Sequence, residues 1–367
     1  MKSVRKVLVL SVGLLLVAGA SEASAATVKW RVEPSPSPGG TQSILYGVSA
    51  SSATNAWAVG CYNVSDPCQS SRALIEHYDG TSWQQTDFRQ PGASGTLYGV
   101  KATSATNAWA VGSWVKNGHQ DALIEHNDGT GWSYQPSVSY KRRHNALYGV
   151  AASSASNAWA VGGALKGSSD YVPIVEHFDG SAWSLNPPTT PGRGASLNSV
   201  TIAAANDVWV AGWYLDKGGE HALLERWDGT DWFAYVFSDP TSYFSDISAT
   251  SPTDVWAVGS EGGAPFVLHF DGGNWRPISP PPLPQESLHG VKAFSGDVWV
   301  VGSWNPAGNR VTLIYRFHNN VWTHVASPNV DSTNELFAVG GTSSTNLFAV
   351  GYDEGTSSLD TLILHRS

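Results

Sequence analysis

The chain has 367 residues, of which 41% are hydrophobic and only 14% are charged, and it contains 38 glycines, 17 tryptophans and one methionine. So few charged residues could not cover long amphipathic helices, and the hydrophobic and aromatic content is too high for a disordered chain. The formal net charge of −9, without a long basic run, disfavours a general nucleic-acid-binding protein.

The N-terminus has the pattern of a secretory signal peptide. Lys2, Arg5 and Lys6 form a positive segment, the apolar run Val7–Ala20 follows, and Ala23–Ala25 supplies small residues for cleavage. The apolar run has 14 residues, whereas a membrane span needs about 20. We therefore expect residues 1–25 to be removed and the rest to be secreted, outside the cell or into the periplasm. An uncleaved anchor is the alternative, and no later apolar run could span a membrane.

Two cysteines, Cys61 and Cys68, stand seven positions apart. In an exported chain such a pair favours a disulfide bond. Asp66 is the one metal-suited side chain between them, so the spacing does not favour a metal site. Two free thiols are the alternative. The sequence predicts neither a metal nor a cofactor.

A unit of four segments, A to D, recurs seven times. In the first unit, A is Leu45–Val48 (LYGV), B is Asn55–Gly60 (NAWAVG), C is Ala73–Tyr78 (ALIEHY), and D starts at Trp83. The tryptophan of segment B recurs at intervals of 43 to 52 residues as Trp57, Trp109, Trp159, Trp209, Trp256 and Trp299, with Phe348 in the seventh unit. The tryptophan of segment D recurs as Trp83, Trp132, Trp183, Trp232, Trp275 and Trp322.

Each segment is a candidate β-strand. Small and large residues alternate in segment B, and segment C is apolar with a polar end. Asp-Gly tolerates the positive φ angles of tight hairpins. This dipeptide joins C to D at Asp79-Gly80, Asp128-Gly129, Asp179-Gly180, Asp228-Gly229 and Asp271-Gly272. An Asn or Asp precedes the aromatic pair of every segment B, as is typical of turns.

Four short strands in each unit of 40 to 50 residues are the signature of a β-propeller. The recurring tryptophans suit packing between adjacent blades. The third position of segment A is mostly small, as in Gly47, which fits a close approach of strands near the axis. Asp246 is the exception at that position.

The last unit ends after segment C, at Leu362–Ser367. The segment Val28–Pro36 resembles a D strand with its exit, comparable to Val321–Pro328 of the sixth unit. We therefore expect the N-terminal strand to complete the seventh blade and close the ring. The predicted fold is all-β: one monomeric, seven-bladed propeller domain over residues 26–367.

With these motifs, residues 26–367 resemble the tryptophan-rich repeat proteins of many secreted bacterial sequences, which carry LxGV, (N/D)xWAVG and LIEHxDGxxW. The resemblance implies a propeller and says almost nothing about a ligand. At the level of fold the chain is similar to sialidase-like and photosystem-assembly propellers. In the sialidase Asp box one residue separates Asp from Gly, whereas Gly80 directly follows Asp79. The resemblance therefore does not imply sialidase activity.

Glu-His pairs recur in segment C as Glu76-His77, Glu125-His126 and Glu176-His177. Adjacent residues of a strand point to opposite faces, so one pair could not act on one atom. Recurrence at one position of several blades also favours an architectural role. We therefore assign no catalytic residue here.

Aromatic residues outside the repeated positions are the candidates for ligand binding. They follow segment B, in what we expect to be the B–C loops at the channel mouth, where flat rings could stack on sugars. The candidates are Tyr62, Trp114, Trp213, Tyr214, Trp304 and Tyr352. The alternative is that these rings cover the edge of strand B.

One basic cluster interrupts the acidic chain, at the connection from segment D to the next segment A. Its residues are Lys141, Arg142, Arg143 and His144. We interpret it as a candidate anion contact, with a solvated loop as the alternative. The run Ser279–Pro284 is expected to be a rigid, extended connector.

The sequence carries no HExxH, GxSxG, P-loop or dinucleotide motif. Asp246, His289 and Tyr46 could meet near the channel, but a water-filled polar channel explains them equally well. We favour a secreted, non-enzymatic binding or scaffold propeller that takes a surface polysaccharide. The alternatives are a polysaccharide lyase or glycosidase, and a platform for envelope protein assembly.

Overall fold

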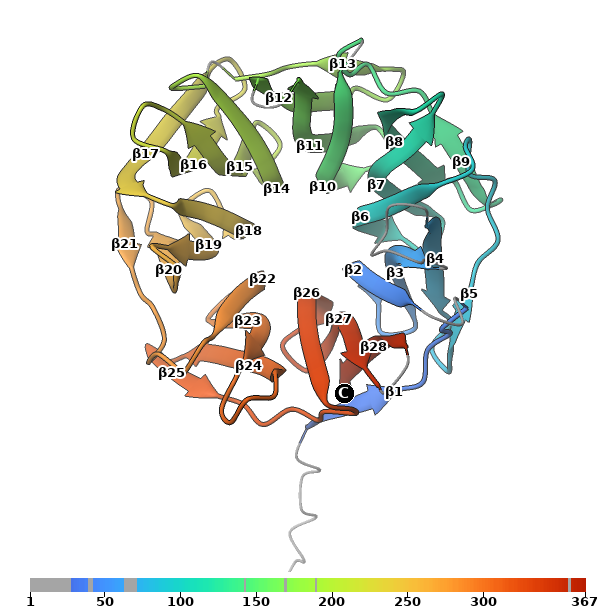
Figure 1. Cartoon of the computed structure of the whole chain (residues 1–367), viewed down its shortest axis with the longest axis vertical. Coiled ribbons are helices and arrows are strands. Elements are labelled where there is room, and N and C mark those ends of the chain that lie inside the picture. The colour runs from blue at the N-terminus through green and yellow to red at the C-terminus, as the bar shows by residue number, and fades with distance from the viewer. Residues whose placement is uncertain are drawn as a thin grey trace, which may run out of the picture.

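The computed structural model describes residues 28–38, 42–62, 71–141, 143–167, 170–188, 190–355 and 358–367, and all regular structure within them is β-strand. The strands form seven four-stranded antiparallel sheets, which stand around a central channel like the blades of a propeller (Figure 1). The predicted all-β, seven-bladed propeller is confirmed.

Each blade runs from strand A at the channel to strand D at the rim (Figure 1). Blade 1 contains β2 (Ser43–Ser52), β3 (Asn55–Tyr62), β4 (Arg72–Tyr78) and β5 (Trp83–Gln85). Blade 2 contains β6 (Gly95–Ser104), β7 (Asn107–Lys116), β8 (His119–Asn127) and β9 (Trp132–Gln135). Blade 3 contains β10 (His144–Ser154), β11 (Asn157–Lys166), β12 (Asp170–Phe178) and β13 (Trp183–Leu185). Blade 4 contains β14 (Gly194–Ala204), β15 (Asp207–Leu215), β16 (Glu220–Trp227) and β17 (Trp232–Pro240).

The remaining blades follow the same order. Blade 5 contains β18 (Ser242–Ser251), β19 (Asp254–Glu261), β20 (Ala264–Phe270) and β21 (Trp275–Pro277). Blade 6 contains β22 (Ser287–Phe294), β23 (Asp297–Trp304), β24 (Val311–His318) and β25 (Val321–His324). Blade 7 contains β26 (Thr333–Ser343), β27 (Asn346–Glu354), β28 (Leu359–Arg366) and, from the other end of the chain, β1 (Trp30–Glu33).

The N-terminal strand closes the ring, as predicted. β1 pairs antiparallel with β28, from Trp30 opposite Arg366 to Glu33 opposite Ile363. Beyond β1, the hydroxyl of Ser35 lies 2.6 Å from that of Thr361, which extends the junction. The ends of the chain therefore hold each other in one blade (Figure 1).

Ring-to-ring contacts join consecutive blades, because the segment-B aromatic of each blade meets the segment-D tryptophan of the next. Trp57 meets Trp132 with ring centroids 5.0 Å apart, nearly edge-on. Trp299 meets Trp30 across the closing junction at 5.8 Å, and Phe348 meets Trp83 at 5.3 Å. The predicted role of the tryptophans between blades is confirmed.

A β-bulge interrupts every A strand at the same place. In β2 the ladder to β3 jumps from Leu45 to Gly47, which leaves Tyr46 as the extra residue. Such a bulge redirects a side chain, and here the extra residues line the channel. A Cβ on Gly47 would lie 2.8 Å from the carbonyl oxygen of Tyr98 in the next blade. The small residue after the bulge, present in every blade except blade 5 with its Asp246, thus permits the close approach that the sequence predicts.

Several predicted features lie outside the described residues: the signal peptide, Cys68 and Arg142. Cys61 is fully buried in β3. Because Cys68 lies outside the described residues, the bond between Cys61 and Cys68 stays a prediction. In the described part of the chain, no helix has the length and apolar character needed to cross a membrane.

Candidate functional site

The seven bulges gather seven side chains around one mouth of the channel. Five of them, from consecutive blades 6, 7, 1, 2 and 3, carry rings, which we call the aromatic arc: His289, Phe337, Tyr46, Tyr98 and Tyr148. Blades 4 and 5 complete the circle with polar Asn198 and Ser245. The mouth is therefore aromatic on one side and polar on the other.

The rings of the aromatic arc touch in sequence around the channel. Ring centroids lie 5.4 Å apart for His289 and Phe337, 5.3 Å for Phe337 and Tyr46, and 5.5 Å for Tyr46 and Tyr98. Tyr98 and Tyr148 follow at 5.4 Å. Such tilted contacts at 5 to 6 Å stabilise a fixed ring arrangement. The arc is thus a pre-formed wall.

A cavity of about 420 Å³ lies inside the circle and is lined by the whole arc. This volume falls in the range of small-molecule sites, roughly 300–1,000 Å³. Tyr148 is 36% exposed, and the other rings of the arc are partly exposed. Burial, with Tyr98 and Tyr171 nearby, raises the pKa of Tyr148 to about 12, so its hydroxyl stays protonated at neutral pH.

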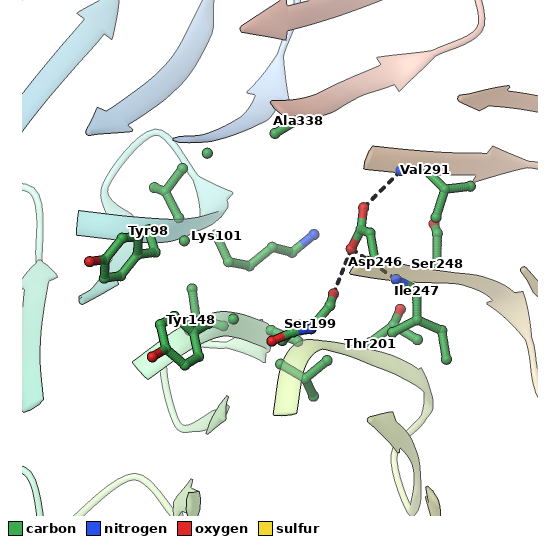
Figure 2. A pocket seen from close by; sticks show the side chains of 18 of the residues that line it. Tyr98, Lys101, Tyr148, Ser199, Thr201, Asp246, Ile247, Ser248, Val291 and Ala338 are labelled. Atoms are coloured by element: carbon green, nitrogen blue, oxygen red, sulfur yellow. Dashed lines mark hydrogen bonds between the residues drawn. The ribbon is translucent and has the colours of Figure 1, made fainter. Parts of the chain in front are cut away.

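Figure 2 shows residues that line this cavity, among them Tyr98 and Tyr148 of the arc. Asp246 from β18 accepts hydrogen bonds from the hydroxyl of Ser199 (2.6 Å) and from the backbone N–H groups of Ile247 and Val291 (both 2.8 Å). These donors come from blades 4, 5 and 6, so the carboxylate ties three blades together. Lys101 extends from β6 into the same space (Figure 2).

A charged cluster adjoins the arc at blades 6 and 7. Its centre is Glu335 on β26, which is buried and accepts from four side chains. Oε1 lies 2.9 Å from His289 Nε2 and accepts from the Ser303 hydroxyl at 3.3 Å. Oε2 accepts from Arg310 Nη1 at 2.7 Å and from the Tyr352 hydroxyl at 3.1 Å. We call these five residues the Glu335 cluster.

The Glu335 carboxyl is held in its ionised form. Burial alone would raise its pKa, but the hydrogen bond and charge of His289, together with Arg310, lower the pKa to about 2. The opposite holds for Tyr352, because burial and the charge of Glu335 raise its pKa to about 12. The cluster therefore presents a fixed carboxylate surrounded by donors.

The Glu335 cluster occurs once in the ring. At the position of Glu335, two residues before the bulge, the other blades carry apolar, hydroxyl or phenol side chains: Ile44, Thr96, Ala146, Ser196, Tyr243 and Ser287. Sequence reasoning singled out His289, Tyr46 and Tyr352 but missed Glu335 and Arg310. The departure of Glu335 from its repeat position was the signal that could have found it.

The six predicted aromatics lie on strands rather than in B–C loops, so that part of the prediction is wrong. Strand B continues past segment B because its ladder to strand C continues. The strands that hold these residues are β3, β7, β15, β23 and β27, for Tyr62, Trp114, Trp213, Tyr214, Trp304 and Tyr352.

Most of these rings are used for packing. Trp114 and Tyr214 are only 7% and 8% exposed, inside cores between blades. Trp213 stands edge-on to Tyr171 at 4.9 Å. Tyr62 and Trp304 are partly buried against neighbouring cores. Tyr352 joins the mouth through the Glu335 cluster, and its ring centroid lies 5.9 Å from that of Phe337 in the arc. Trp114, although mostly buried, also lines a pocket beside Tyr46 and Tyr98.

The basic cluster is only partly described. Lys141 is exposed, and the guanidinium of Arg143 lies 5.8 Å from the ring centroid of Tyr140. His144 opens β10, and its Nδ1 accepts a hydrogen bond of 3.4 Å from the backbone N–H of Gln120. None of the three lines the cavity inside the arc, but His144 lines a neighbouring pocket together with Tyr46 and Tyr98. An anion contact there stays a prediction.

No protein-family model matches the chain, and no curated protein matches its sequence. Solved propeller structures share its fold. Virginiamycin B lyase from Staphylococcus aureus aligns over 92% of this chain and 100% of its own, with a TM-score of 0.62 and 13% identity. YCF48 from Cyanidioschyzon merolae aligns over 92% of this chain and 98% of its own, with a TM-score of 0.59 and 15% identity. YCF48 bound to D1 peptide aligns over 92% of this chain and 96% of its own, with a TM-score of 0.58 and 14% identity. At such identities the likeness extends to the fold alone.

Proposed function

We propose that this protein is a secreted, non-enzymatic binding propeller that holds a carbohydrate at the channel mouth. The aromatic arc is the observation that carries the proposal. It offers tyrosine faces on one side of a 420 Å³ cavity, opposite the amide of Asn198 and the hydroxyl of Ser245. A sugar ring has apolar C–H faces and a rim of hydroxyls, so it matches a mouth of this kind.

The proposal includes that the protein is exported and that it is related to the secreted tryptophan-rich repeat proteins. They rest on the signal-peptide pattern and on the resemblance to secreted tryptophan-rich repeat proteins. The expected ligand is a surface polysaccharide, because an exported chain meets such polymers. The outer aromatics of strand B are not needed for this function.

A glycan array with the folded mature protein tests the proposal, followed by calorimetry on each glycan that binds. Tyr148→Ala should weaken binding at least tenfold, because it removes the most exposed face of the arc. Tyr134→Ala is the matched control, since Tyr134 is similarly exposed (39% against 36%) but lies on the outermost strand of its blade. Absence of binding to every glycan, or equal losses in both variants, would reject the carbohydrate ligand.

The Glu335 cluster favours a second candidate, an enzyme that cleaves an acidic polysaccharide. A lyase needs a base beside the substrate and cations that offset its carboxylate. His289 is oriented by Glu335 and lines the cavity. The half-exposed Arg310 forms an ion pair with the same Glu335 carboxylate. Turnover of a uronate polymer, followed by the absorbance of unsaturated sugar ends, would support the enzyme. His289→Ala should then abolish turnover.

The third candidate is a protein-binding platform in the cell envelope. A YCF48 structure contains a bound D1 peptide, so a propeller of this general shape does hold a peptide. Cross-linking in the native envelope, with the Tyr148→Ala variant as comparison, separates this candidate from the first. The protein ligand would be favoured if the wild type cross-links to a protein, the Tyr148→Ala variant does not, and no glycan on the array binds.

A further inference from the structure

Two lysines stand at equivalent places in the channel wall, below the aromatic arc. Lys101 on β6 and Lys292 on β22 each follow their bulge by three residues. Each lies opposite the segment-B tryptophan of its own blade, Trp109 or Trp299. The five remaining blades place small side chains at this register position: Ser49, Ala151, Thr201, Ser248 and Gly340. The lysines are therefore departures from the repeat, and both line the cavity.

Neither ammonium group has a hydrogen bond or an ion pair within the described part of the chain. The contact recorded for Lys292 is with the ring of Phe294, whose centroid lies 5.4 Å from Nζ. Burial lowers the pKa of both lysines. The nearby Lys101 adds to the effect on Lys292, the charge of Asp246 opposes it in part, and the pKa of Lys292 falls to about 8. Lys292 therefore remains cationic at pH 6.5. A desolvated ammonium group without a hydrogen-bonded partner is costly, so an anion that entered would be stabilised.

Within the part of the chain that the structure describes, the carboxylate in this cavity forms no hydrogen bond or ion pair with either lysine. Asp246 is the one acidic side chain among the described residues of the lining. Its oxygens already accept three hydrogen bonds, from Ser199, Ile247 and Val291 (Figure 2). Two cations against one carboxylate leave the cavity positive, inside a protein whose formal net charge is −9.

We propose that the channel binds a small oxyanion, a sulfate or a carboxylate, between Lys101 and Lys292. Both ions offer several oxygens to two ammonium donors, which suits charge-assisted hydrogen bonds. The ion could be free, or it could be the carboxylate of a uronic acid whose ring rests on the aromatic arc. The second version rests on the proposed function, and the first does not.

The test is a titration of the mature protein with sodium sulfate, sodium acetate and sodium glucuronate at pH 6.5, with sodium chloride keeping the ionic strength constant. Melting temperature and equilibrium dialysis of labelled sulfate are the measurements. The wild type should show a saturable rise in melting temperature, because the ion binds the folded state. Lys101→Met and Lys292→Met should each weaken binding at least tenfold. Lys116→Met, at an exposed lysine of β7, is the matched control and should bind as the wild type does.

The three titrations distinguish a site for a free ion from a site for a uronate. A free-ion site predicts that sulfate and acetate bind and that Tyr148→Ala has no effect. A uronate site predicts that glucuronate binds more tightly than acetate and that Tyr148→Ala removes this advantage while sulfate binding persists. Absence of binding to every glycan, uronates included, would reject the proposed function, whereas saturable sulfate binding would still support the anion site.

A measurement on the wild type keeps the proposal falsifiable if a variant does not fold. Saturating sulfate should raise the pKa of Lys292, followed by the NMR shift of its ε-carbon, by at least one unit. The proposal is overturned if no anion binds saturably to the wild type, if that pKa stays unchanged, or if the folded double variant binds sulfate as tightly as the wild type.

Discussion

The segment-B aromatic ring of each blade, Trp in six blades and Phe348 in the seventh, is held from two sides. In blade 1 the imidazole of His77 lies over Trp57 with ring centroids 4.2 Å apart, while Trp132 of the next blade meets its edge. The ring nitrogen Nε2 of His77 lies 2.7 Å from Oδ1 of Asn55. Asparagine before the tryptophan thus fixes the ring that stacks on it, which the interpretation as a turn residue did not anticipate.

The residue before the aromatic pair contacts a histidine in five blades and an arginine in blades 4 and 6. Both arginines lie opposite an aspartate, Asp207 or Asp297, whereas Asp254 of blade 5 contacts His269. Where the residue before the aromatic pair is Asn107, its partner is His126 at 2.8 Å. Where it is Asp297, the partner is Arg316, which donates twice to the carboxylate at 2.7 Å. The guanidinium of Arg316 then lies over Trp299, with 5.3 Å to the ring centroid. The residues of the Glu-His pairs accordingly make separate contacts.

The buried glutamates of segment C make stability depend on pH. Glu125 is fully buried, and neither of its carboxyl oxygens has a hydrogen-bond partner in the described part of the chain. Burial raises its pKa from 4.5 to about 8. The folded state therefore binds the proton more tightly than the unfolded state. This contribution to stability is complete below pH 4.5 and is lost as pH rises to about 8.

We predict that Glu125→Gln flattens the loss of stability between pH 5 and pH 8, by about 1.4 kcal/mol for each pH unit. Urea unfolding at several pH values measures this. Glu176→Gln is the matched control at the equivalent position of blade 3. There the carboxylate accepts from the Ser137 hydroxyl (2.6 Å) and the Val138 N–H (3.2 Å), so the ion is partly satisfied. Equal pH profiles for Glu125→Gln and the wild type would contradict the prediction.

The candidate site could be predicted only in part. We sought binding aromatics outside the repeat, and this criterion selected Trp114 and Tyr214, which are buried. Tyr98 and Tyr148 of the arc were missed because they repeat, like Tyr46, within segment A. A residue that repeats around a ring does not only pack, because the axis of a propeller gathers one copy from every blade.

At the scale of elements, strand number, order and closure followed from the sequence. The bulges did not, because a bulge is a mismatch between two paired strands and needs their register. In β18, for example, the ladder jumps from Phe244 to Asp246, and Ser245 enters the channel wall. The length of strand B was also hidden. Its pairing with strand C continues in β7 as far as Lys116, opposite His119, without a sequence break.

We predict that the closing strand is essential for stability. Deleting residues 28–36 would leave the outer edge of β28 unpaired and remove the contact of Trp30 with Trp299. An unpaired strand edge promotes aggregation. The truncated protein should therefore aggregate or melt far below the mature chain. Calorimetry and light scattering would show it, and an unchanged melting temperature would refute the closure argument.

Single substitutions in β1 refine that test. Trp30→Ala should lower the free energy of unfolding by about 3–5 kcal/mol, because it empties a buried site between blades 6 and 7. Val32→Ala lies two residues further on, at a side chain that is 40% exposed, and should change stability by about 0.5 kcal/mol or less. Equal effects of the two substitutions would mean that β1 acts through its backbone pairing alone.

The connection from β3 to β4 should carry a disulfide bond between Cys61 and Cys68. Protein made through the secretory route should show no free thiol before reduction, by mass spectrometry with and without alkylation. The closed loop is short, so the bond should contribute about 2–3 kcal/mol at most. Its reduction should loosen blade 1 near this connection and leave the ring intact. Two free cysteines in the exported protein would disprove the bond.

At the scale of the whole molecule, the ring determines where a ligand can bind. The seven blades close into a ring, and each four-stranded sheet keeps only its outermost strand as an edge at the rim. This is consistent with the expectation of a monomer, which light scattering after gel filtration can measure. The blades meet at one axis, and the residues that depart from the repeat concentrate there: Asp246, His289, Lys101, Lys292 and Glu335.

One axis implies one ligand for each chain. From the sequence, Trp114, Trp213 and Trp304 of blades 2, 4 and 6 predict several shallow sites, with strong avidity for a polymer. The structure buries Trp114 and places the open tyrosine faces at one mouth. We therefore predict a stoichiometry of one by calorimetry, using a soluble oligosaccharide chosen from the glycan array.

The same argument fixes how affinity should depend on ligand length. An oligosaccharide that fills the mouth should bind nearly as tightly as the polymer, per binding end, because no second site on the chain adds avidity. Trp213→Ala and Trp304→Ala should leave affinity unchanged, whereas Tyr98→Ala and Tyr148→Ala should reduce it. A stoichiometry near three, with additive losses of affinity in the tryptophan variants, would show that the ligand binds on separate blades and not at the axis.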